Sequence, residues 1–158
     1  MSKQDDVLAL VQKSLKKLYT EQRYLIENRV SERSIVFWFG VYFHDYLKDS
    51  EFSDYDLDIE YNRNLGDAKR TRHFPRGTFP DLILHRRGSN QRNLLVMEFK
   101  PWWNNQRDRD IQKIKDFTHP EGNYNFELGL WVELGRNEAA ITKVSNGEVI
   151  DTPLKSFQ

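Results

Sequence analysis

The chain has 158 residues, carries 24 Lys and Arg against 24 Asp and Glu, and therefore has a formal net charge of zero. This length favours one domain that can bury a core without covalent staples, and an aromatic content of 13% argues against global disorder. The chain has no cysteine, which excludes disulfides, thiolate metal sites and cysteine nucleophiles.

No targeting or membrane-spanning segment is predicted. Residues 1–20 are polar and basic and lack the apolar stretch of a signal peptide. The most apolar window, residues 35–47, is too short to cross a bilayer. We therefore expect a cytoplasmic protein with no membrane partner.

Two helices are expected in the first third of the chain. Apolar residues recur at helical spacing over about 4–19, while the lysines of that segment lie off the apolar stripe. A second helix begins near Ser31, which suits an N-cap, and continues to Leu47. Because it is apolar on nearly all sides, we expect it to be well buried, with His44 packed or hydrogen-bonded inside.

The period then changes to that of strands. Residues 56–61 alternate polar and apolar side chains, as a half-buried strand does, and 62–79 are polar and basic and read as a loop. Two short apolar runs, 82–84 and 94–97, flank the turn sequence 88–90 and predict a β-hairpin. Pro101 ends the second strand because proline cannot donate to the ladder.

The last third of the chain predicts one helix and further strands. The helix covers 108–118, strands cover 126–134 and 139–144, and a short apolar run at 149–150 follows an Asn-Gly turn. The resulting order, α-α-β-β-β-α-β-β, predicts a single α/β domain.

The predicted hairpin brings three charged side chains together. With a tip at 89–90, Asp81 faces Glu98, and facing residues lie on one side with Cβ atoms roughly 4.5–5.5 Å apart. Lys100, two residues after Glu98, shares that side, whereas Phe99 points to the core. Two carboxylates this close repel each other, and Mg²⁺, which prefers oxygen ligands, would neutralise them. The backbone carbonyl of Phe99 would add a further oxygen, and Lys100 would orient an attacking water and stabilise negative charge.

These residues resemble a known family. Pro80-Asp81 followed by Glu98-Phe99-Lys100 is similar to the PD-(D/E)XK motif of the restriction-endonuclease-like nucleases, and to small prokaryotic members in particular. The resemblance covers 31–134 and implies an αβββαβ core with a mixed central sheet flanked by helices. Residues 1–30 would then form a helical extension, and 135–158 would form C-terminal strands and a tail, all within one domain spanning 1–158.

The resemblance also implies an activity. Such proteins use Mg²⁺ or Mn²⁺ to hydrolyse phosphodiester bonds, in DNA more often than in RNA, which points to a DNA endonuclease. Asp81 and Glu98 carry over as metal ligands, Lys100 as the catalytic lysine and Glu32 as an acidic residue near the metal. Cleavage of both strands of a duplex requires two sites, which a homodimer would supply.

The charge is unevenly distributed. Residues 61–92 carry eight basic and two acidic side chains, a net charge of +6, and Asp81 lies within this segment. A basic surface next to the proposed site would contact phosphates. The best candidates for nucleic-acid binding are Arg63, Arg70, Arg72 and Arg76.

Other interpretations stay open from the sequence. Asp81, Glu98 and Lys100 could form an ordinary cross-strand salt bridge, and Glu32 could be an acid favoured by the helix dipole. The same fold could serve as a non-catalytic nucleic-acid-binding module. It could also be an interaction domain that uses Trp102 and its neighbours. Gln112 or Lys113 could face the site from the helix after the motif.

Overall fold

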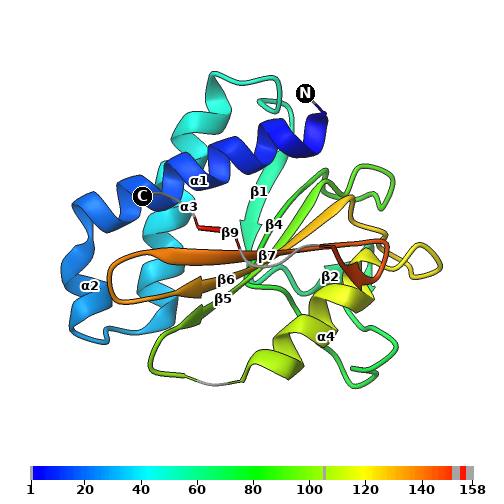
Figure 1. The fold of residues 1–158 in the computed structure, drawn as a ribbon. Helices are drawn as coiled ribbons and strands as arrows, with labels where there is room; N and C mark the ends of the chain where they lie inside the picture. Colours follow the sequence, from blue (N-terminus) through cyan, green and yellow to red (C-terminus); the bar gives the residue numbers. More distant parts are fainter. Residues whose placement is uncertain (1, 105, 151–153, 156–158) are drawn as a thin grey trace.

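A mixed β-sheet with helices on both faces forms the core of the protein (Figure 1). The computed structural model describes residues 2–104, 106–150 and 154–155. The sheet has seven strands, which confirms the α/β class and the mixed sheet expected from the sequence. None of the helices in these described ranges has the length and apolar character needed to cross a membrane.

The helices agree with the predicted ones, with one addition. A short helix after the first was not predicted. Ser2 caps the first helix through a capping box with Asp5, and Ser31 accepts from the backbone of Ser34 as the predicted N-cap. The helices are α1 (Lys3–Glu21), α2 (Arg23–Glu27), α3 (Glu32–Lys48) and α4 (Arg107–Thr118).

The main strands occur where the alternating and apolar runs predicted them. The predicted loop 62–79 also contains two short strands, β2 and β3, which pair with each other. The strands are β1 (Asp56–Ile59), β2 (Arg63–Asn64), β3 (Asp67–Ala68), β4 (Leu82–His85), β5 (Leu95–Pro101), β6 (Leu128–Leu134), β7 (Ala139–Ser145), β8 (Glu148–Val149) and β9 (Leu154–Lys155).

The sheet order is β1-β4-β5-β6-β7-β8, with β9 also paired to β7. β4 and β5 form the predicted antiparallel hairpin, and α4 crosses over from β5 to the parallel strand β6. The pairing of β9 with β7 was not predicted from the sequence. It brings residues from the expected C-terminal tail back to the sheet, while residues 151–153 and 156–158 lie outside the described ranges.

Alternating residues of the strands build two cores on opposite faces of the sheet. Met97 and Phe99 face α1 and α3, and the Phe99 ring lies 5.0 Å from that of Phe39 between ring centroids. Val96 and Trp131 face α4 on the other side. The prediction that Phe99 points away from Glu98 and Lys100 is therefore confirmed.

The prediction that the second helix is well buried holds for one side of it only, and the prediction that His44 lies inside is wrong. Only one side of α3 packs against the sheet and α1, so Phe37 is 50% exposed and His44 is also exposed. The apolar residues of α3 exceed the area that its neighbours can cover. Burial follows from packing partners as well as from side-chain polarity.

Candidate active site

The hairpin has the register that the sequence predicted. Ile83 pairs with Val96 and Leu82 pairs with Met97, which puts Asp81 opposite Glu98. The backbone N–H of Asp81 donates to Oε2 of Glu98 at 2.9 Å, and the N–H of Phe99 donates to Oδ2 of Asp81 at 2.8 Å. Backbone N–H groups of the facing strand ends thus hold both carboxylates at the end of the hairpin.

Helix α4 adds two charged residues on the same face of the sheet. The Nζ atom of Lys100 lies 3.1 Å from Oδ2 of Asp110. Lys113, one turn further along, forms an ion pair with Oε1 of Glu98. All four residues in these two pairs are largely shielded from solvent, so neither pair resembles the exposed cross-strand salt bridge left open by the sequence.

The Asp110 contact was missed by sequence reasoning, and the Lys113 contact resolves an alternative that it left open. Asp110 and Lys113 are three residues apart, so they share a face of α4. Opposite charges at that spacing are equally typical of a salt bridge on the solvent-exposed side of a helix. Only the crossover packing of α4 on β5 shows that they face the motif instead.

Glu32 begins α3 and interacts with Asp81 from the other side of the hairpin end. Burial raises the pKa of Glu32 to about 7, and the negative charge of Asp81 adds to the shift. The pKa of Glu98 is also raised, first by its complete burial and then by the charge of Asp81, although Lys113 opposes the shift. Burial and the charge of Asp81 thus disfavour the ionised forms of Glu32 and Glu98.

Lys100 keeps its proton in this setting. Burial alone would lower the pKa of Lys100, but the hydrogen bond and charge of Asp110, with the charges of Glu32 and Asp81, outweigh burial and raise it. A cationic ammonium thus lies beside the carboxylates. It can stabilise a developing negative charge or hold a water by hydrogen bonding.

A small cavity opens onto Asp81 and Glu32. It has a volume of about 270 Å³ and is lined by Glu32, Arg33, Ile59, Glu60 and Asp81 among others. Glu60 points outward and pairs with Arg33 at 3.3 Å, as expected for an exposed strand-end residue. Asp81 and Glu32 are therefore the acidic groups that a ligand in this cavity meets at the motif.

The donor chemistry suits a hard divalent cation, with one rearrangement. Within the described part of the chain, no three His, Cys, Asp or Glu side chains are already grouped to hold a metal ion. However, a bound cation would favour the ionised forms of Glu32 and Glu98, which burial disfavours, and Phe99 turns its N–H toward Asp81. Since the N–H and C=O of one strand residue lie on the same edge, the Phe99 carbonyl is directed to that edge too. A cation bound by Asp81 and Glu98 would displace the ammonium of Lys113.

The four predicted nucleic-acid-binding arginines are all exposed but are not equivalent. Arg70 and Arg72 line a second, larger cavity beside α4. Arg63, on β2, and Arg76 line neither this cavity nor the smaller one at Asp81. The predicted basic segment is therefore divided between a concave site and open surface.

Trp102 is part of the protein's own packing. Its Nε1 donates to the carbonyl of Ile26, and the guanidinium groups of Arg29 and Arg136 lie over its ring. These contacts anchor α2 to the end of β5 and favour a structural role over the contact surface left open by the sequence.

No protein-family model matches the chain, and no curated protein matches it.

Proposed function

We propose that this protein is a Mg²⁺- or Mn²⁺-dependent nuclease that hydrolyses phosphodiester bonds, with DNA as its substrate and endonucleolytic cleavage as its mode. The proposal is supported above all by the hydrogen bonds that hold the two carboxylates at the hairpin end, from the N–H of Asp81 to Glu98 and from the N–H of Phe99 to Asp81. Lys100 and Glu32 meet them there, as the PD-(D/E)XK resemblance requires. A restriction-endonuclease-like core is the finer fold that goes with this assignment.

Each residue has a distinct task in the proposed reaction. Asp81, Glu98 and the Phe99 carbonyl would hold the cation, which when bound supplies positive charge for the phosphate and for activation of water. Lys100 orients the water through its ammonium and stabilises charge on the phosphate. Asp110 holds Lys100 in place at 3.1 Å. Glu32, with its pKa raised to about 7, can accept or release a proton near neutral pH.

A cleavage assay with purified protein tests the proposal. Labelled duplex and single-stranded DNA should be cut in Mg²⁺ or Mn²⁺ and left intact in EDTA. Asp81→Ala and Lys100→Ala should each reduce the rate by at least about 100-fold while leaving the circular dichroism spectrum unchanged. Asp45→Ala, on an exposed carboxylate of α3, is the matched control and should cut like wild type. Wild-type rates in both motif variants would refute the assignment.

A non-catalytic nucleic-acid-binding module is the second candidate. The observation that favours it is the ion pair between Lys113 and Glu98, because an ammonium that neutralises Glu98 reduces the need for a metal. Such a protein would bind DNA with a steep salt dependence but would not cut it. Binding without cleavage in Mg²⁺ and in Mn²⁺ would favour this alternative.

A further inference from the structure

A second cavity lies beside the middle and end of α4. Its volume is about 510 Å³, within the range of roughly 300–1,000 Å³ that small-molecule sites occupy. Its walls come from the basic segment 70–75, from α4 and from the chain around Tyr124. The cavity shares none of its lining residues with the smaller cavity at Asp81.

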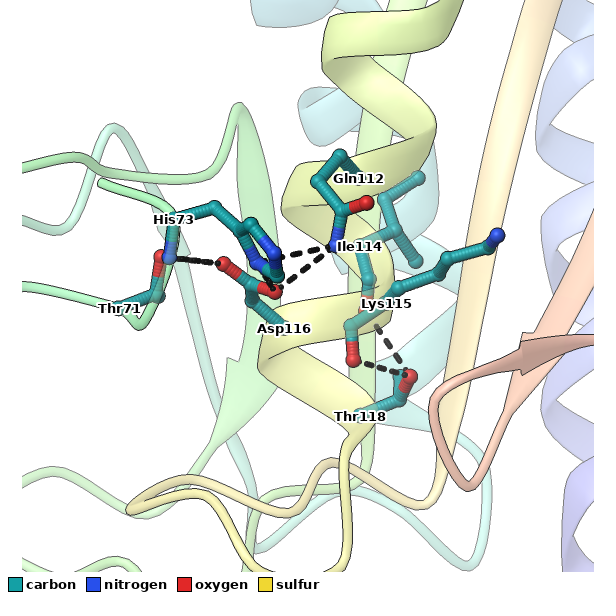
Figure 2. A network of polar contacts seen from close by, with 7 residues as sticks. All are labelled: Thr71, His73, Gln112, Ile114, Lys115, Asp116 and Thr118. Carbon is teal, nitrogen blue, oxygen red and sulfur yellow. Dashed lines mark hydrogen bonds and ion pairs between the residues drawn. The ribbon is translucent and has the colours of Figure 1, made fainter.

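A buried carboxylate organises one wall of this cavity (Figure 2). Asp116 accepts hydrogen bonds from the hydroxyl of Thr71 at 2.8 Å, from the backbone N–H of His73 at 3.0 Å and from the amide of Gln112 at 3.0 Å. Burial alone would raise the pKa of Asp116, but these bonds outweigh burial and lower it. Asp116 is therefore an ionised group whose charge is already satisfied by donors.

Asp116 also orients His73. The Nδ1 atom of His73 lies 2.7 Å from Oδ1 of Asp116, and since an ionised carboxylate only accepts, Nδ1 must donate. This fixes the tautomer and leaves Nε2 as the ring nitrogen available to a ligand. The side chain of His73 is 48% exposed, so a ligand in the cavity can reach it.

The remaining charge of the cavity is positive. Arg70, Arg72 and Lys115 line it, and within the described ranges none of the three takes part in an ion pair. The acids on the walls are Asp116, which is satisfied, and the exposed Glu121. Guanidinium and ammonium groups suit a phosphate, and the volume leaves room for a sugar and a base.

Helix α4 links this cavity to the candidate active site. Lys113 contacts Glu98, whereas Lys115 and Asp116 line the cavity two and three residues later. At 1.5 Å per residue, these positions are only about 3–5 Å apart along the helix axis. Helix α4 therefore contributes residues to both sites.

We propose that this cavity binds one nucleotide of the nucleic-acid strand, with the phosphate held by the guanidinium groups of Arg70 and Arg72 and with Nε2 of His73 accepting from an N–H or O–H group of the nucleoside. The strand is the nucleic-acid substrate of the proposed nuclease, so this inference rests on the proposed function. The shared chemistry is that of a nucleoside monophosphate, whether it is free or part of a strand. Asp116 is a positioning residue that acts through His73.

Calorimetric titration in EDTA tests the cavity without metal binding or cleavage. The probes are deoxyadenosine 5′-monophosphate, deoxyadenosine, inorganic phosphate and a single-stranded deoxyadenosine hexanucleotide. We expect the monophosphate to bind more tightly than either of its parts and the hexanucleotide to bind more tightly still. Equal affinity for inorganic phosphate and the monophosphate would overturn the nucleotide assignment. A hexanucleotide no tighter than the monophosphate would overturn the assignment to a strand.

Variants separate this cavity from the carboxylate site. His73→Ala and Arg72→Ala should each weaken hexanucleotide binding about tenfold. Because hexanucleotide binding is measured in EDTA and cleavage is measured in Mg²⁺, absence of cleavage with intact binding at the cavity would count against the proposed nuclease alone, and the two failures are told apart. Lys16→Ala, at an exposed position of α1 on the opposite face, is the control and should bind like wild type. Affinity unchanged in both cavity variants would overturn the proposal.

Discussion

Two buried acidic groups on the same side of the sheet differ in how their charge is satisfied. Asp116 accepts hydrogen bonds from His73, Thr71 and Gln112, which lower its pKa against the effect of burial. Glu98 instead lies against Asp81, and burial with that second negative charge raises its pKa. The hydrogen bonds to Asp116 favour its ionised form, whereas the surroundings of Glu98 disfavour its ionised form even with Lys113 beside it. A bound cation would therefore be stabilised more at the hairpin end than beside Asp116.

The largest expected effect on stability is at Asp116. Asp116→Ala removes the shared acceptor of Thr71, His73 and Gln112, and we expect a loss of about 3 kcal/mol in the free energy of unfolding. Urea denaturation measures this loss. Asp81→Ala, which relieves repulsion among carboxylates, should cost much less or be stabilising. If the two variants lose equal stability, the contrast between the two regions does not hold.

Lys113 is the present counter-charge of Glu98. Lys113→Met leaves Glu98 buried without its cation, so we expect the metal-free protein to lose about 2 kcal/mol of stability. Because a bound metal would take over the role of the ammonium, Mn²⁺ should raise the melting temperature of this variant more than that of wild type. Lys115→Met, two residues along the same helix, should show the wild-type response. An equal Mn²⁺ shift in Lys113→Met and wild type would mean that Lys113 does not compete with a metal.

The smallest expected effect concerns pH. Since folding raises the pKa of Glu32 from 4.5 to about 7, the folded protein binds more protons than the unfolded chain between those values. The contribution of Glu32 to stability therefore falls as the pH rises through that window. In EDTA at pH 7.5, Glu32→Gln should be more stable than wild type by about 1 kcal/mol, a value reduced because Glu32 is partly exposed.

Thermal unfolding at pH 4.5 and 7.5 checks this effect. The advantage of Glu32→Gln should vanish at pH 4.5, where the native glutamate is protonated in the folded protein. An advantage of the same size at both pH values would assign it to packing rather than to charge.

The sequence predicted the hairpin end well because strand geometry is local. The turn chemistry at 88–90 set the register, and the two-residue period put Glu98 and Lys100 on one face. Ser31 was recognisable as a cap for a similar reason, since its hydroxyl acts within one turn of α3. These features depend on residues that are neighbours in the chain or across one turn.

Contacts between distant elements could not be predicted in the same way. Asp110 and Lys113 approach the motif only because α4 packs on β5 after a crossover, and Asp116 meets His73 across 43 residues of chain. The incomplete burial of α3 has the same origin, because it depends on how much surface the neighbouring elements cover. Pairings of this kind are set by tertiary packing and leave no periodic signal.

The central claim is that Asp81 and Glu98 bind a divalent cation, and calorimetric titration with Mn²⁺ tests it most directly. Wild-type protein should bind Mn²⁺, Asp45→Ala should bind it equally well, and Asp81→Ala should lose most of the binding heat and affinity. Mn²⁺ binding that is the same in wild type and in Asp81→Ala would contradict the account.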